Sequence, residues 1–244
     1  MFRYFIKLAY DGSDFHGWQM QDNAHSVQAE LTEKLVLMLK EDFHIVGCGR
    51  TDTGVHAREF YAHFDINSEI EGIRDFIYKL NSFLPRSIAI YDLYLVDNEM
   101  HTRFSAKSRT YKYYISTQKN PFKENFSYQF LPKLDVKNMN KAAEMLLEYT
   151  DFTSFSKLHT QTATNNCDIS HAKWEETDEM LVFTITADRF LRNMVRAIVG
   201  TLIEVGKGKM KVEDFRKVIE SKDRREAGIS APAKGLFLHD IIYL

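Results

Sequence analysis

The chain has 244 residues, of which 44% are hydrophobic and 27% are charged. This length suits one large domain or two small ones, and the composition excludes disordered and fibrous proteins. The 32 Lys and Arg residues against 34 Asp and Glu residues leave a net charge of −2, so the whole-chain charge gives no sign of a polyanionic partner. Cys48 and Cys167 stand far apart without zinc-ligand spacing, and no apolar stretch reaches the ~20 residues of a membrane span. We therefore expect a reduced, soluble, cytoplasmic protein.

The first hundred residues have the pattern of a β-α-β-β-α-β unit. Aromatic and β-branched residues indicate the strands, and apolar residues at helical spacing indicate the helices. The predicted elements are a strand at 2–10, a helix from the N-cap Ser26 to about Lys40, a strand at 44–48, a loop at 49–54, a strand at 60–66, a helix at 72–82 and a strand at 88–96.

The remaining residues repeat this alternation of strands and helices. The predicted elements are a strand at 111–116, a helix from the N-cap Asp135 to about Tyr149, a strand at 181–187, helices at 190–205 and 212–221, and a closing strand at 236–244. We expect an α+β protein of two ferredoxin-like or RRM-like halves, residues 1–104 and 105–244, with a boundary near Met100–Ser105. Each half would carry its helices on one face of an antiparallel sheet and leave a cleft between the halves.

Basic residues are concentrated in two windows. Residues 100–123 contain six Lys and Arg and no acid, and residues 189–211 contain six against the single acid Glu204, so twelve of the 32 basic residues lie there. Aromatic residues alternate with the basic ones in the first window, a composition suited to phosphate neutralisation and base stacking. Two solvated faces would give the same pattern.

The segment Gly47–Ala57 places three glycines around Arg50 and Asp52. Glycine lets a ligand approach the backbone closely, and a carboxylate held there between two strands can act as a nucleophile or a base. A plain turn, in which Asp52 hydrogen-bonds to the backbone, is the competing interpretation.

Arg189, Arg192 and Arg196 are spaced to share one face of the predicted helix 190–205. A guanidinium aimed from that helix at Asp52 would keep the carboxylate ionised and oriented. The alternative is that these arginines contact solvent or phosphate.

Other chemistry finds no support in the sequence. His56 and His63 lack a third ligand at metal spacing. The glycine-rich motifs of ATP and dinucleotide sites and the nucleophile elbow of hydrolases are also missing. Any reaction is therefore expected to need neither metal nor cofactor.

The sequence resembles the tRNA pseudouridine synthases of the A type. Six matching segments occur in the family's order over nearly the whole chain: 10–19, 49–57, 103–113, 151–155, 193–202 and 231–236. The block Gly-Arg-Thr-Asp-Thr-Gly-Val-His, which begins at Gly49, is the most specific of them. Residues 157–172 match the family poorly.

This resemblance implies an enzyme that isomerises uridine to pseudouridine at positions 38, 39 and 40 of the tRNA anticodon stem-loop. It also implies a homodimer that uses no cofactor, with two α+β halves joined across a central basic cleft. The family's catalytic aspartate falls on Asp52, and the arginine thought to displace the target base falls on Arg50. The tyrosine that stacks on the uracil falls on Tyr111, the arginine that pairs with the aspartate on Arg196, and an apolar residue of the base pocket on Leu236.

Several alternatives stay open. The strand pattern alone allows Tyr111, Tyr113 or Tyr114 to face the cleft, and Leu236 cannot be told from core. Asp52 can add to the base, attack C1′, or remove a sugar proton to give a glycal. A non-catalytic RNA-binding protein of the same fold is the alternative function. The retention of Asp52 with Arg50 and Arg196 favours the enzyme, because a binder gains nothing from an acid facing phosphates.

Overall fold

The computed structural model describes residues 1–157, 164–177 and 179–243. Residues 158–163, part of the segment that matches the family poorly, lie outside this range. The chain forms two compact units. The first is Met1–Lys107 together with the C-terminal residues from Leu238 onward, and the second is Ser108–Phe237. The expected second half, 105–244, therefore differs from the observed unit at its end, because the last strand returns to the first unit.

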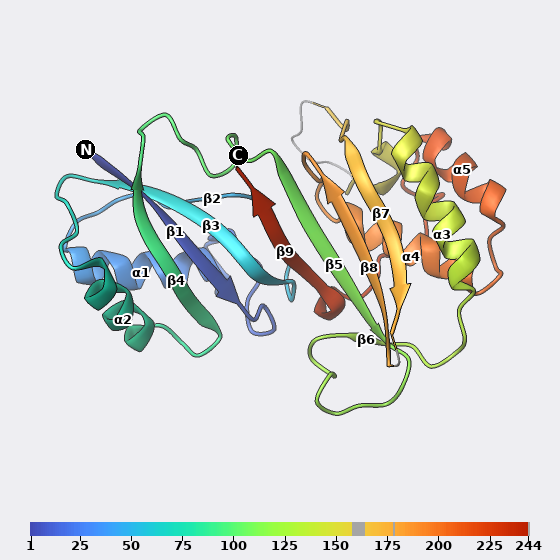
Figure 1. The fold of residues 1–244 in the computed structure, drawn as a ribbon, viewed down its shortest axis with the longest axis horizontal. Coiled ribbons are helices and arrows are strands. Elements are labelled where there is room, and N and C mark those ends of the chain that lie inside the picture. Colours follow the sequence, from blue (N-terminus) through green and yellow to red (C-terminus); the bar gives the residue numbers. More distant parts are fainter. Residues whose placement is uncertain (158–163, 178, 244) are drawn as a thin grey trace. The chain divides into compact units, whose positions relative to one another are not determined.

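The first unit follows the predicted element order (Figure 1). Its elements are β1 (Phe2–Tyr10), α1 (Val27–Leu39), β2 (Val46–Gly47), β3 (His56–Ile66), α2 (Ile73–Phe83) and β4 (Ile88–Val96). Strand β1 pairs antiparallel with both β3 and β4, so the strand order is β4-β1-β3, and the short β2 pairs with β3. The strands predicted at 2–10 and 88–96 are confirmed residue for residue.

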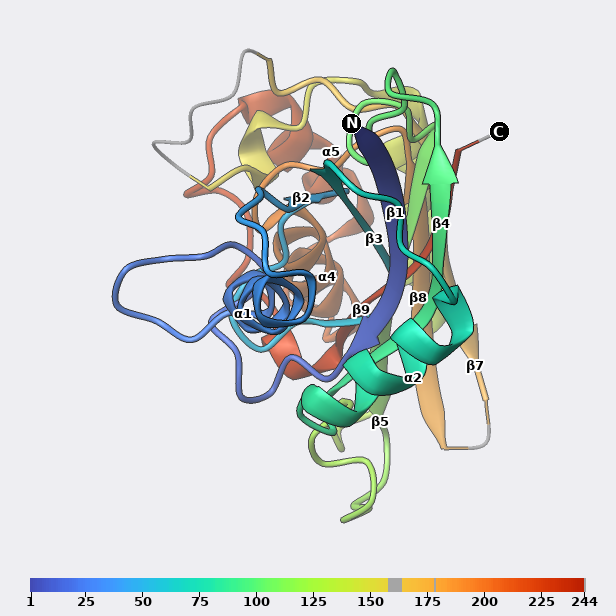
Figure 2. The same ribbon diagram turned by 90° about the vertical axis from the view of Figure 1, so that its left-hand side faces the viewer.

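Helix α1 begins where the sequence predicts it. The hydroxyl of Ser26 accepts a hydrogen bond from Ala29 N at 3.3 Å, as an N-cap does. Val27 and Leu31 lie on the buried face, and Lys40 ends the helix in the left-handed region at φ 54°. Figure 2 faces this unit and shows α1 nearly end-on beside β1.

Strand β3 is buried on both faces. Phe60, Ala62 and Phe64 alternate toward the core as predicted, but Tyr61 and His63 on the opposite face are also buried. Tyr243, near the C-terminus, packs edge-on against Tyr61 with ring centroids 5.1 Å apart. The returning chain end therefore covers a face that the alternation pattern alone would leave to solvent.

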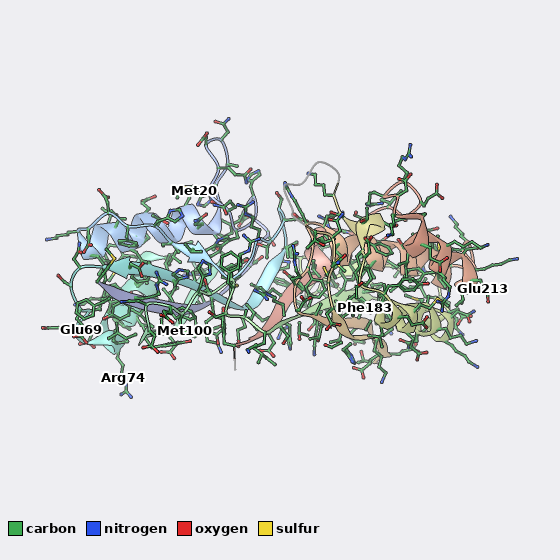
Figure 3. All side chains as sticks on the ribbon, turned by 90° about the horizontal axis from the view of Figure 1, so that it is seen from above. Met20, Glu69, Arg74, Met100, Phe183 and Glu213 are labelled. Carbon is green, nitrogen blue, oxygen red and sulfur yellow. The ribbon has the colours of Figure 1, made fainter. Side chains whose placement is uncertain are left out.

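The second unit is built on the antiparallel strands β5-β8-β7. Its elements are β5 (Ser108–Ser116), β6 (Tyr128–Gln129), α3 (Val136–Glu144), β7 (Ile169–Glu176), β8 (Met180–Ala187), α4 (Met194–Gly206), α5 (Val212–Ser221) and the start of β9 (Leu236–Ile242). Figure 3 labels Phe183, which is fully buried in β8, and Glu213, which is exposed on α5. The chain is thus an α+β protein with a mostly antiparallel sheet, in which the short β6 pairs parallel with β5.

Helix α4 begins four residues later than predicted. Asn193 adopts the left-handed region at φ 65°, which breaks the helix before Met194. Arg189 and Arg192 therefore precede the helix, and the predicted arginine stripe is wrong; of the three, Arg196 alone lies on α4. The helical spacing of the apolar residues misled the prediction because the buried Leu191 continues the period outside the helix.

No helix within the described parts of the chain has the length and hydropathy needed to cross a bilayer.

Candidate active site

Asp52 lies in the loop between β2 and β3. These strands are antiparallel neighbours, with Val46 opposite His63, so the loop closes a hairpin. Val55 N donates to the Asp52 carbonyl at 3.1 Å and forms a turn inside the loop. Asp52 itself is half-buried. The strands thus hold both ends of the carboxylate's loop.

The end of β1 and the loop that follows it, residues 11–18, form hydrogen bonds with the Asp52 loop. The Tyr10 hydroxyl forms a buried hydrogen bond of 2.8 Å with Thr51 Oγ1, and Trp18 N donates to the Thr51 carbonyl at 3.3 Å. A Cβ atom at Gly17 would lie 2.3 Å from the Thr51 oxygen, and the φ of Gly17 is +85°. Only glycine allows this approach without strain. The residue next to Asp52 is therefore fixed through both its side chain and its backbone.

His56 belongs to the frame of this loop. Its side chain is 1% exposed, and its Nδ1 accepts a hydrogen bond from Gly12 N at 3.1 Å. The same Nδ1 lies 3.1 Å from Asp11 Oδ1. Within the described residues, no group of three or more His, Cys, Asp and Glu side chains is arranged to hold a metal ion.

Arg50 projects from the same loop as Asp52 and is exposed. Its Nε donates to Gln19 Oε1 at 3.1 Å. The sequence alone indicates no role for Gln19, although this residue ends the first of the segments that match the family. The contact joins two segments that are 31 residues apart.

Arg196 lies in the first turn of α4, in the second unit. Its Nε donates to the Ala231 carbonyl at 2.8 Å, and Ala231 N donates to the Arg196 carbonyl at 2.9 Å. Ser230 accepts hydrogen bonds from Asn193 Nδ2 at 2.7 Å and from Arg224 at 2.9 Å. The loop that holds the Arg196 side chain is therefore tied to the start of α4.

The three tyrosines of β5 have different environments. Tyr113 is fully buried, and its hydroxyl donates to the Pro232 carbonyl at 2.9 Å. Tyr111 is half-buried and meets Phe190 edge-on, with centroids 5.1 Å apart at 85°. Tyr114 packs against Phe237 in the same manner. Burial removes Tyr113 as a stacking residue and leaves Tyr111 and Tyr114.

The predicted site residues fall into two groups, one in each unit. Arg50 and Asp52 share one loop of the first unit. In the second unit, Tyr111 lies on β5, Arg196 on α4, and Leu236 at the start of β9. Leu236 is 5% exposed, so the structure does not distinguish it from a core residue.

The basic windows reach the surface in both units. None of their twelve Lys and Arg side chains is buried. In the first window, Arg103 lies over the ring of Phe104, which is 75% exposed. In the second, Lys207 pairs with Glu204 at 2.8 Å. Basic side chains at a surface are the kind of group that binds phosphates.

Comparison with known proteins identifies the class first. Residues 142–244 match a family model described as tRNA pseudouridine synthase. Curated proteins named tRNA pseudouridine synthase A match nearly the whole chain. That of Bacteroides thetaiotaomicron is 54% identical over 100% of this chain and 91% of its own, that of Parabacteroides distasonis 52% over 100% and 96%, and that of Bacillus subtilis 39% over 97% of each. The chain belongs to the tRNA pseudouridine synthase A family.

One solved structure, a CRISPR endoribonuclease Cse3 bound to 19 nt RNA, aligns with a TM-score of 0.23 at 10% identity, over 86% of this chain and 94% of that one. A similarity this low supports no conclusion about fold or function.

Proposed function

We propose that this protein isomerises uridine to pseudouridine at positions 38, 39 and 40 of the tRNA anticodon stem-loop, with Asp52 as the catalytic carboxylate. Its family membership makes it an isomerase that acts on tRNA. The observation that carries the choice of Asp52 is its half-buried position in a loop that Tyr10, Gly17 and Trp18 clamp at Thr51. A carboxylate held this firmly can meet a substrate atom without reorganising.

The reaction breaks the C1′–N1 bond and forms a C1′–C5 bond. The hydrogen on C5 leaves as a proton, N1 gains one, and no energy source or electron carrier is consumed. A base inside a stem must first be flipped out, at a cost of a few kcal/mol. Arg50, two residues from Asp52 in the same loop, is proposed to enter the vacated space.

The second unit supplies the remaining groups of the proposed site. Tyr111 and Leu236 are proposed to hold the uracil between them while it is detached from the sugar. Arg196 is proposed to pair with the catalytic carboxylate. Support for Arg196 comes from its Nε contact with Ala231, which directs the guanidinium, and from the planar fork with which a guanidinium binds a carboxylate.

The proposal also covers the fold of each unit, the oligomeric state and the cellular location. Each unit is a ferredoxin-like half, supported in the first unit by its β-α-β-β-α-β order; that the halves join across a basic cleft stays a prediction. The protein works as a homodimer, as its resemblance to the family implies. It acts in the cytoplasm on tRNA, and the exposed basic windows are suited to the phosphates.

The deciding experiment maps pseudouridine in tRNA from cells with and without the gene. We expect pseudouridine at positions 38, 39 and 40 to disappear with the gene and to return when the gene is restored. A non-catalytic RNA-binding protein of the same fold would leave these pseudouridines in place, and their persistence would refute the proposed function.

A further inference from the structure

A buried glutamine on α1 begins a chain of hydrogen bonds that ends at Arg50. Gln28 is 3% exposed, and its Nε2 donates to the Ile45 carbonyl at 2.8 Å. Its Oε1 accepts from Gln19 Nε2 at 2.7 Å and from Met20 N at 2.7 Å. Gln19 Oε1 then accepts from Arg50 Nε at 3.1 Å. Met20, whose side chain is exposed, is labelled in Figure 3.

The chain of bonds has a fixed direction. A carbonyl oxygen accepts only, so Ile45 requires the NH₂ group of Gln28. The oxygen of Gln28 must then face Gln19 and Met20, where two donors meet it. Gln19 is consequently held with its own NH₂ group inward and its oxygen outward. Only this orientation of the Gln19 amide presents an oxygen that can accept a hydrogen bond from Arg50.

The backbone around Gln19 is held by the same helix. Val27 N donates to the Gly17 carbonyl at 3.2 Å, and Gln28 N donates to the Trp18 carbonyl at 3.0 Å. Trp18 N in turn donates to the Thr51 carbonyl, between Arg50 and Asp52. The first turn of α1 therefore reaches the catalytic loop twice, once through the backbone of residue 18 and once through the side chain of Gln19.

We propose that Gln19 and Gln28 are positioning residues for Arg50, which aim its guanidinium at the space left by the flipped base. The inference rests on the proposed role of Arg50 and deepens it. An exposed arginine samples many rotamers, and a bond at Nε restricts them while both Nη groups stay able to contact RNA. Such preorganisation reduces the conformational entropy that the Arg50 side chain loses when it enters the tRNA stem.

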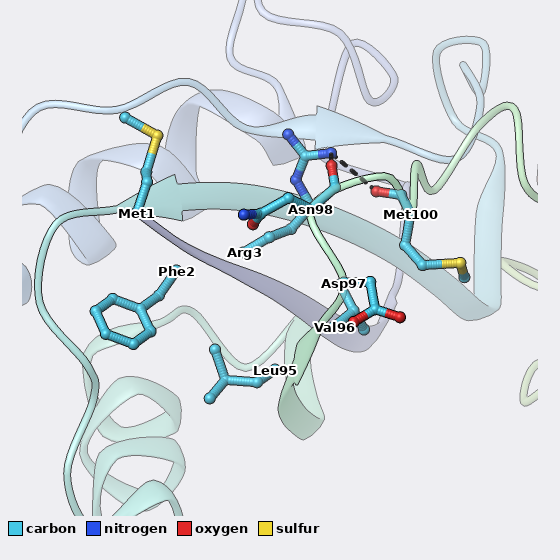
Figure 4. A pocket seen from close by; sticks show the side chains of 8 residues that line it. All are labelled: Met1, Phe2, Arg3, Leu95, Val96, Asp97, Asn98 and Met100. Atoms are coloured by element: carbon cyan, nitrogen blue, oxygen red, sulfur yellow. Dashed lines mark hydrogen bonds between the residues drawn. The ribbon is translucent and has the colours of Figure 1, made fainter.

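Other features of the molecule support no comparable inference. An open hollow of about 580 Å³ lies beside the start of β1, and Figure 4 shows the side chains that line it. The cationic side chain that lines it, Arg3, is half-buried and already donates to both oxygens of Asp65 at 2.7 Å and to the Met100 carbonyl at 3.0 Å. The cationic side chain at this hollow is thus already paired.

The test is a double-mutant cycle between Gln19→Leu and Arg50→Ala, with Gln21→Leu as the matched control. Gln21 lies in the same loop, is exposed, and donates to the His16 carbonyl at 3.2 Å. The measurements are the single-turnover rate of pseudouridine formation, the tRNA dissociation constant, the melting temperature, and the fluorescence of 2-aminopurine placed beside the target uridine.

We expect Gln19→Leu to lower the single-turnover rate about 10- to 100-fold, as misplacement of a catalytic group does. The 2-aminopurine signal of base flipping should fall with the rate. The dissociation constant and melting temperature should stay near those of the wild type and of Gln21→Leu. Combined with Arg50→Ala, Gln19→Leu should cause no further loss, because its effect acts through Arg50.

Additive losses in the double variant, or a wild-type rate for Gln19→Leu, would overturn the inference. An unchanged rate for Arg50→Ala would overturn it as well. All three results leave the proposed function standing, provided the wild type forms pseudouridine; a wild type without activity would instead refute the proposed function.

Gln28→Glu tests the direction of the relay. Glutamate has the same shape but no NH₂ group for Ile45, so we expect the rate to fall to the level of Gln19→Leu. A folded Gln28→Glu protein with the wild-type rate contradicts the relay. If the variant does not fold, the Gln19 cycle decides.

Discussion

Arg196 and Ala231 hold each other through two hydrogen bonds. The Nε of Arg196 donates to the Ala231 carbonyl at 2.8 Å, and Ala231 N donates to the Arg196 carbonyl at 2.9 Å. The loop before β9 thereby fixes both the backbone and the guanidinium of an arginine proposed to serve the catalytic carboxylate. A charge alone would not need this second contact, so the shape of the side chain is expected to matter.

The first prediction follows from that shape. Arg196→Lys keeps the charge but loses the planar fork and the Nε–H that meets Ala231. We expect single-turnover pseudouridine formation to fall about 100-fold, or roughly 3 kcal/mol of transition-state stabilisation. The control is Arg216→Lys, which changes an exposed arginine paired with Glu148 in the same unit. Equal rates for the two variants would contradict the account of Arg196.

Tyr111 and Tyr113 can be separated by mutation. Tyr111→Leu removes the proposed stacking surface. It should raise the activation free energy of the reaction by about 1–3 kcal/mol and change the unfolding free energy little. Tyr113→Phe removes a buried hydroxyl that donates to the Pro232 carbonyl at 2.9 Å, so it should cost stability of about 1 kcal/mol and leave the chemical step alone. Urea unfolding and single-turnover rates measured on both variants check the assignment, and reversed effects would refute it.

Gly17, in the loop that contacts Thr51, and Gly49, in the Asp52 loop, should respond differently to substitution by alanine. Gly17→Ala places a Cβ 2.3 Å from the Thr51 oxygen at φ +85°, and we expect a loss of about 2 kcal/mol or more in unfolding free energy. At Gly49 nothing lies within 4 Å of the added Cβ, so Gly49→Ala should match or slightly exceed the wild type. Urea denaturation compares the two variants. A neutral Gly17→Ala would show that the two loops are not clamped.

His63 predicts a loss of stability in acid. Burial, together with the nearby charges of His101 and Arg3, lowers the pKa of His63 from 6.5 to about 4. Its Nδ1 lies 2.8 Å from the Thr102 hydroxyl inside the protein. The unfolded chain takes up a proton near pH 6.5 and the folded chain does so only near pH 4. Stability is therefore complete above about pH 6.5 and falls toward pH 4.

We expect this histidine to remove about 1 to 2 kcal/mol of unfolding free energy between pH 7 and pH 5. His63→Gln should flatten that part of the curve. The exposed His171, mutated to Gln, is the control and should leave the slope unchanged. An identical acid slope in His63→Gln and the wild type would exclude His63 as the cause.

Local patterns predicted most of the elements. Strands β1 and β4 and helix α5 match their expected bounds, because the apolar pattern of each is confined to the residues of the element. Strand β7 was missed. A register shift between Ile169 and His171 breaks its alternation, and the extra residue of a bulge disrupts a period of two.

The site was predictable only in part. Glycines around Asp52 indicate a loop that something approaches closely, and the structure identifies that partner as residues 11–18. The relay from Gln28 through Gln19 to Arg50 could not be read from the sequence, because hydrogen bonds between distant segments leave no local pattern. Residues such as Tyr111 and Leu236 owe their assignment to the family resemblance, since strand periodicity gives core and site residues the same signature.

The most direct test of the central claim is tritium release from tRNA labelled at C5 of uridine, measured with the Asp52→Asn protein. Asparagine preserves the size of the side chain and removes the carboxylate, so tRNA binding and melting temperature should change little. We predict no detectable release of tritium and no pseudouridine. Release at the wild-type rate by Asp52→Asn would contradict the assignment of Asp52 as the catalytic group.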